Sequence, residues 1–298
     1  MVPTLKAEFK KLLTVRSTYI LAAIAIILVG LFTYFGTSRI VYEEEVEPAT
    51  SSQQSPQAEQ RAANDPPSRP ETRTVVIKDL PKERLISHLQ DNIPVVALFT
   101  AVTVVLLMGH EFRYNTITYT LTTSNSRTKA LASKIIVSIF YTALVTLLAM
   151  ATIIAATYAA VHIKDLNLPP QTYNWGYILA RLVGYALGFS LLALAIITLV
   201  RNLIAGVVAI FLLPTIDAVV GELLKNWDIE ATKVLPFSAL NRVENLAADY
   251  IPRNVPDDGI ADLQLLPATL LGATAIFAAY FIGIWIISWY LFLRRDAT

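Results

Sequence analysis

Six long apolar segments constrain this 298-residue chain more than any other feature of its sequence. A helix that crosses a bilayer needs about 20 mostly apolar residues, with a range of about 17–25. The segments that meet this requirement are 18–37, 93–109, 135–161, 176–199, 203–220 and 268–293. The sequence therefore predicts an all-α integral membrane protein with six transmembrane helices, in which residues 1–298 form a single transmembrane domain.

The composition excludes several classes of protein. Only 16% of the residues are charged, whereas an average soluble domain has roughly 25%. The 24 Lys and Arg nearly balance the 23 Asp and Glu, and a nucleic-acid-binding protein would show a basic excess. There is no cysteine, so disulfides, thiolate metal sites and cysteine nucleophiles are excluded.

The flanking charges predict the orientation of the helices. The segment after the first apolar block is a poor cleavage site and the block is long for a signal peptide, so we expect a retained first span. With the N-terminus inside, the inner segments hold 11 basic and three acidic residues, whereas the outer segments hold 12 and 19. This asymmetry follows the positive-inside rule and places both termini in the cytoplasm.

The N-terminal segment has the pattern of a basic amphipathic helix. Leu5, Phe9, Leu12 and Leu13 recur at helical spacing, and the basic residues fall largely on other faces. Such a helix is suited to lying on the inner leaflet, and the alternative is a solvated helical tail. We expect these side chains to anchor the chain at the inner membrane interface: Phe9, Lys10, Arg16, Arg127 and Lys134.

The two long outer loops differ in composition. The 38–92 loop is rich in Pro, Gln and Ser through Pro70, which predicts a largely disordered spacer, with a substrate-receiving or partner-binding arm as the alternative. The 221–267 loop carries apolar residues at helical spacing around Pro236. It predicts one or two short interfacial helices before the sixth span, with Trp227 and Tyr250 in an aromatic belt. Structural packing and a lid over an exit path are both open roles for it.

The sequence contains no catalytic signature. It has no GxxxxGK phosphate-binding loop and no HExxH motif. Its three histidines lie near span ends in different segments, so we expect no metal site. Ser190 lies in a span that has no histidine to activate it, and we expect it to pack between helices. No catalytic residue is predicted.

Two charges and two glycines stand out within the spans. Arg181 and Asp217 fall in the outer halves of neighbouring helices. A mutual ion pair, or extension of both side chains to the outer interface, explains them, and a polar element of a translocation path is the alternative. Gly184 and Gly188 have the GxxxG spacing that permits close helix packing.

The cytoplasmic loop at 110–134 is the most informative segment of the chain. Glu111 begins it at the membrane edge, Phe112–Leu121 is predicted to form a short helix parallel to the membrane, and Ser126 or Thr128 can cap the next helix. The alternative interpretation is that this loop is only a basic connection between two spans that satisfies the positive-inside rule.

This loop resembles the corresponding loop in the permease subunit of type-2 ABC exporters. The positions that match the family pattern are Glu111, Arg113, Thr116, Leu121, Arg127 and Lys134. Asn115 stands where the family has Gly, and the turn proline of the family is replaced within Ser124-Asn125. The order of an amphipathic N-terminal helix, six spans and outer interfacial helices is similar to the family along the whole chain.

The resemblance implies a transport subunit that has no chemistry of its own. The loop would be a coupling helix that docks on a separate cytoplasmic ATPase, which binds the ATP and Mg, while this chain binds no cofactor. Glu111, Phe112, Arg113 and Leu121 would transmit the motion, and the N-terminal helix would act as an elbow. Two permeases, identical or related, and two ATPases would assemble in the plasma membrane of a prokaryote.

The cargo implied by the composition is hydrophobic, amphipathic or lipid-linked, because the spans offer few polar groups. Two other classes stay open. An ion-coupled secondary carrier would need internal repeats and ion ligands near the membrane midplane. An intramembrane enzyme would need buried histidine or paired carboxylates.

Overall fold

The computed structural model describes residues 2–38, 80, 84–117, 126–168, 173–245 and 270–294. Eight α-helices and one short 3-10 helix, η1, lie within these ranges. The helices are α1 (Val2–Thr14), α2 (Arg16–Ser38), α4 (Arg84–Arg113), α6 (Arg127–Ile163), α7 (Trp175–Val200), α8 (Leu203–Lys225), α9 (Pro236–Glu244) and α11 (Leu270–Arg294); η1 is Ala231–Lys233.

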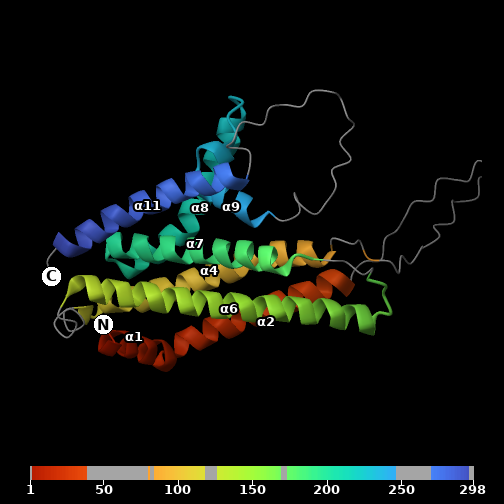
Figure 1. Ribbon diagram of the computed structural model, residues 1–298, viewed down its shortest axis with the longest axis horizontal. Coiled ribbons are helices and arrows are strands. Elements are labelled where there is room, and N and C mark those ends of the chain that lie inside the picture. Colours follow the sequence, from red (N-terminus) through yellow and green to blue (C-terminus); the bar gives the residue numbers. More distant parts are fainter. Residues whose placement is uncertain are drawn as a thin grey trace, which may run out of the picture.

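Six of these helices are long and apolar enough to cross a membrane, which confirms the predicted fold class. They are α2, α4, α6, α7, α8 and α11, and each contains most or all of one predicted span. The chain is therefore an all-α, multi-pass integral membrane protein. Both ends of the chain lie at the same end of the bundle (Figure 1), as an even number of spans requires, and the charge asymmetry predicts that this end faces the cytoplasm.

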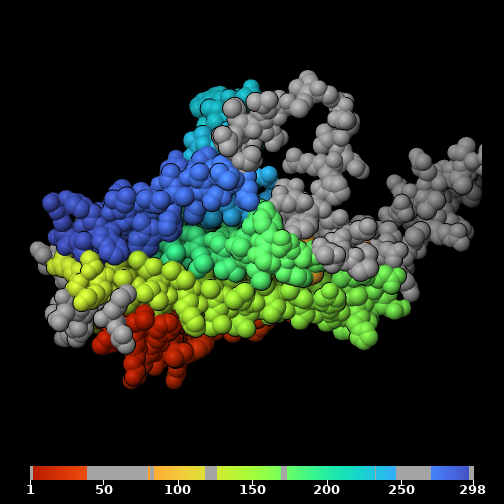
Figure 2. Space-filling model, viewed as in Figure 1, coloured from red at the N-terminus to blue at the C-terminus, as the bar shows by residue number. Residues whose placement is uncertain are grey.

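Helix α4 occupies the centre of the bundle. It packs against α2, α6, α7 and α8, and its buried side chains form much of the apolar core. Helix α11 packs against α7 and α9, while α1 packs against α6. The long helix α6 runs along one whole face of the molecule (Figure 2), and α8 runs obliquely to the other spans (Figure 1).

The connection between α7 and α8 is a tight hairpin, as expected from the three residues that separate the predicted spans 176–199 and 203–220. Arg201 ends α7 in the left-handed region with a φ of 55°. Asn202 then caps α8 by accepting a hydrogen bond from the amide of Ala205 at 3.1 Å, which is a common role for Asn at this position. A Cβ at Gly109 of α4 would lie 2.5 Å from Leu203, so the start of α8 presses closely on the cytoplasmic end of α4.

Two predicted boundaries in α4 need correction. The helix that contains the second span begins before the predicted start at residue 93, since α4 begins at Arg84. The predicted short helix from Phe112 is wrong at its start, because Phe112 and Arg113 belong to the last turn of α4 and residues 114–116 form a turn. The remainder of that predicted helix, including Leu121, lies outside the described residues.

The outer segment after α8 contains the predicted short helices, η1 and α9. Pro236 begins α9 at a first-turn position, where its fixed φ and missing amide hydrogen favour a helix start. α9 packs against α7, α8 and α11, so it is built into the bundle and does not only rest on the membrane surface. Trp227 is exposed. Tyr250 lies outside the described residues, as do residues 39–79 and 81–83 of the predicted 38–92 loop, whereas residues 84–92 of that loop belong to α4.

Candidate functional site

Four charged side chains meet at the cytoplasmic end of the bundle. Lys134 of α6 lies 2.8 Å from a carboxylate oxygen of Glu8 and 2.5 Å from one of Glu111. Lys11 of α1 also pairs with Glu111 and lies 4.0 Å from Glu8. We call Glu8, Lys11, Glu111 and Lys134 the cytoplasmic ion cluster, and it joins α1, α4 and α6.

The cytoplasmic ion cluster is largely removed from water. Glu111 is 1% exposed and Lys134 is 5% exposed. Two carboxylates and two ammonium groups balance in charge, which offsets the cost of removing them from water. Such clusters contribute less to net stability than to the choice of one arrangement, because any displaced partner leaves an unpaired buried charge. The cluster therefore fixes the position of α1 against α4 and α6.

The turn at residues 114–116, after α4, lies close in the chain to Glu111 of this cluster. The guanidinium of Arg201 lies over the ring of Phe112, 5.9 Å from its centre, which links this turn to the α7–α8 hairpin. Arg113 and Tyr114 are exposed, and Arg113 lies 5.5 Å from the centre of the Tyr114 ring. Asn115 has a φ of 53°, a conformation that Gly and Asn adopt most readily.

The predicted interface anchors fall into two groups. Lys10 and Arg16 are exposed, as the prediction requires. Lys134 is buried in the cytoplasmic ion cluster, so its prediction as a membrane-interface anchor is wrong. Phe9 packs edge-on against Phe140 of α6 at 5.2 Å, and Arg127 donates a hydrogen bond to the carbonyl of Leu293 at the end of α11. These two side chains therefore contact protein.

The two intramembrane charges hold the opposite ends of α9. Asp217 accepts hydrogen bonds from the amides of Phe237 and Ser238 at 3.0 and 2.8 Å, and from the Ser238 hydroxyl at 2.6 Å. At the other end, Arg181 donates to the carbonyls of Arg242, Val243 and Asn245 at 2.7 to 3.2 Å.

This arrangement matches the electrostatics of a helix. The N-terminus of a helix carries partial positive charge and unpaired amides, and its C-terminus carries partial negative charge and unpaired carbonyls. Asp217 and Arg181 satisfy these groups at the correct ends. Among the described residues the two side chains do not pair with each other, so the predicted mutual ion pair is wrong.

The two glycines of the predicted packing motif behave differently. A Cβ at Gly188 would lie 3.0 Å from the Phe277 ring of α11 and 3.2 Å from Leu240 of α9. Close packing at Gly188 is therefore real. Gly184 is exposed, and a Cβ there would meet no atom within 4 Å among the described residues, so the described part of the chain provides no close packing at that position.

Ser190 lies in the contact between α4 and α7. Its side chain is fully buried, and its hydroxyl lies 2.9 Å from that of Thr100 on α4. Hydrogen bonds of this kind join helices within a membrane. The hydroxyl is therefore used in helix packing, as we expected.

A scan against protein-family models finds no match for this chain, and a search of curated proteins finds no relative. The class of protein that the structure defines is a six-span, multi-pass membrane protein.

Proposed function

We propose that this chain is the permease subunit of an ATP-driven exporter of the type-2 ABC class. In this proposal it works in the plasma membrane of a prokaryote with a second permease copy and a separate pair of cytoplasmic ATPase subunits. It moves a hydrophobic, amphipathic or lipid-linked substrate outward by alternating access. ATP and Mg bind to the partner, and this chain supplies the path.

The observation that carries the proposal is the cytoplasmic ion cluster directly behind an exposed turn. Arg113 and Tyr114 face the cytoplasm and are accessible to a partner. Phe112, the residue before Arg113, contacts Arg201 of the α7–α8 hairpin. Glu111, the residue before Phe112, forms ion pairs with Lys11 of α1 and Lys134 of α6. A partner that displaces this turn would therefore move α1, α4, α6 and the α7–α8 hairpin together. Such a linkage suits transmission of force from an ATPase.

The backbone of the turn adds support to the resemblance. Asn115 stands at the family's Gly position and takes the left-handed conformation that makes Gly favourable there. The substitution of Asn for Gly therefore preserves the course of the chain.

An ion-coupled carrier finds less support in the structure. Both charged side chains identified within the spans are engaged at the ends of α9, in the outer half of the molecule. They have a structural explanation that needs no coupling ion.

Purification from the native membrane tests the proposal. The tagged full-length chain, extracted in a mild detergent, should carry an ABC ATPase in equimolar amount. Charge reversal by Arg113→Glu should abolish ATP-dependent export, whereas Lys129→Glu, an exposed control on α6, should have little effect. Export that follows a proton or sodium gradient without ATP, with no ATPase in the complex, would contradict the proposal.

A further inference from the structure

A cavity of about 520 Å³ opens between α4, α7, α8 and α9 in the outer half of the molecule. Cavities that hold small ligands commonly measure about 300–1,000 Å³. None of the predictions from sequence placed a site here. The cavity opens onto the apolar surface of α8, since Phe211 in its wall is 50% exposed.

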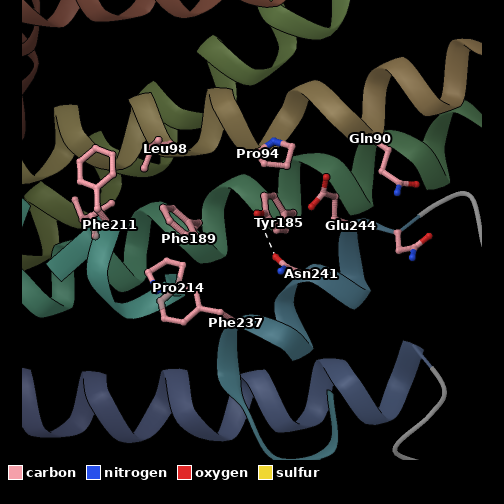
Figure 3. Close-up of a pocket in the computed structure, with 12 residues that line it drawn as sticks. Gln90, Pro94, Leu98, Tyr185, Phe189, Phe211, Pro214, Phe237, Asn241 and Glu244 are labelled. Carbon is pink, nitrogen blue, oxygen red and sulfur yellow. Dashed lines mark hydrogen bonds between the residues drawn. The ribbon is translucent and has the colours of Figure 1, made fainter. Parts of the chain in front are cut away.

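The two ends of the cavity differ in chemistry. Figure 3 shows Leu98, Phe189, Phe211, Pro214 and Phe237 gathered at one end, and Gln90, Asn241 and Glu244 at the other. Gln90 and Leu98 are eight positions apart on α4, which corresponds to about 12 Å along a helix. The apolar end is the deeper one along the spans, and the polar end lies toward the outer surface. An amphiphile of the outer leaflet has this orientation.

Glu244 is the unusual member of the cavity wall. Glu244 is 7% exposed, and its side chain lines the cavity. Within the described part of the chain, its carboxyl group has neither a hydrogen-bond partner nor an ion-pair partner. An unpaired carboxyl group in a largely apolar cavity is costly, and a ligand that pairs with it would remove this cost. The carboxyl group is directed into the cavity beside Pro94 and Tyr185 (Figure 3).

The charge around Glu244 determines which ligand fits. Burial, and after it the nearby carboxylate of Asp91, raise the pKa of Glu244 to about 8. Tyr185 of α7 faces Glu244 as well. Arg181 binds the carbonyls of Arg242 and Asn245, and Arg84 interacts with Asp91, whereas Glu244 has no basic partner of its own among the described residues. A cation would pair with Glu244, whereas an anion would be repelled.

We infer that this cavity binds an amphipathic amine, with its ammonium group on Glu244 and its apolar body among Phe189, Phe211 and Phe237. Binding of an amine to this cavity can be measured without an ATPase. The inference that the cavity holds the cargo of an exporter rests on the proposed function. Failure of binding and failure of ATP-driven export are therefore separate results.

The test uses three probes that share one apolar body and differ in their head group. They are 4-(4-fluorophenyl)butylamine, the matching alcohol and the matching carboxylic acid. Each is titrated into the full-length protein in phosphatidylcholine nanodiscs, and binding is followed by ¹⁹F NMR with empty nanodiscs subtracted. The amine should bind saturably at submillimolar concentration, the alcohol more weakly and the acid not at all.

Three substitutions make the result specific. Glu244→Gln keeps the shape of the protonated carboxyl group, so the fold should persist, and it should weaken amine binding at least tenfold without changing alcohol binding. Glu222→Gln is the control, since this carboxylate is exposed on α8. Leu98→Trp fills the apolar end and should weaken both probes. Equal amine affinity in wild type and Glu244→Gln, or no saturable amine binding by the wild type, would overturn the inference.

Varying the pH tests whether the ionised carboxylate of Glu244 binds the amine, and varying the lipid distinguishes a lipid amine from a free amine as the natural occupant. Because the ammonium group binds the ionised carboxylate, amine affinity should rise about tenfold per pH unit below pH 8, and Glu244→Gln should remove this dependence. Phosphatidylethanolamine in the nanodisc should displace the probe if the natural occupant is a lipid amine, and should leave binding unchanged if it is a free amine. Either result supports an amine site, and amine affinity independent of pH in the wild type would contradict it.

Discussion

The strongest test of the cytoplasmic ion cluster removes Lys134, which contacts both carboxylates of the cluster. Lys134→Met leaves Glu8 and Glu111 with only Lys11, so the cluster changes from neutral to a net charge of −1. Glu111 is 1% exposed, and water therefore cannot replace the missing ammonium group. Breaking a buried pair in this way costs about 3–5 kcal/mol of the free energy of unfolding.

A double-mutant cycle separates the ion pair from packing effects. Glu111→Gln alone should also destabilise the protein, but the Lys134→Met/Glu111→Gln double variant should be more stable than the sum of the two costs predicts, by about 1–3 kcal/mol. Unfolding in mixed micelles with increasing SDS, followed by circular dichroism, measures these differences. Lys129→Met on the exposed side of α6 is the control. The reasoning is refuted if Lys134→Met unfolds at the same SDS fraction as Lys129→Met. It is also refuted if the stability loss of the double variant equals the sum of the losses of Lys134→Met and Glu111→Gln.

Three further predictions concern the outer half of the molecule. Asp217→Asn removes the charge that accepts three hydrogen bonds from the start of α9, and should cost about 1–3 kcal/mol in the same unfolding assay, whereas the exposed Glu222→Gln should change stability by less than about 0.5 kcal/mol. Gly188→Ala should destabilise by about 1–3 kcal/mol because its Cβ meets an aromatic ring, while Gly184→Ala should be neutral or stabilising; equal effects would refute the packing argument. Because the pKa of Glu244 is raised from 4.5 to about 8, the folded protein holds a proton that the unfolded chain releases, so stability should fall as pH rises through this window; an unchanged slope in Glu244→Gln would contradict this.

The sequence predicts the membrane fold well because hydropathy is a local property. Each span is a long, predominantly apolar run, and the Asn202 cap lies beside the helix that it begins. The hairpin between α7 and α8 was predictable for the same reason, since only three residues separate two apolar segments.

The side-chain partners were much less predictable, because they come from distant parts of the chain. Lys134 and Glu8 are 126 positions apart, so a basic residue at a membrane edge gave no sign that it would be buried. Asp217 and Arg181 bind backbone groups of α9, and a backbone amide or carbonyl leaves no mark in a sequence. The available signal was that two isolated charges within apolar spans precede, in chain order, a short amphipathic helix that begins at Pro236.

The two glycines show the limit of a spacing motif. Gly184 and Gly188 are indistinguishable by spacing, yet only Gly188 faces α9 and α11. Which side of a helix meets a neighbour depends on the packing of the whole bundle. Likewise, the cavity forms from four helices, and Glu244 becomes unusual only because none of those helices supplies a partner.

The most direct test of the central claim uses the absence of native cysteine. A single cysteine in place of Tyr114, which is 64% exposed at the cytoplasmic turn, is labelled with a photo-crosslinker in native membranes, and the products are identified by mass spectrometry. Trp227→Cys at the outer end is the matched control. The account predicts crosslinks from position 114, and none from position 227, to an ATPase that contains a phosphate-binding loop. Crosslinks from position 114 to no ATPase, with efficient labelling, would contradict it.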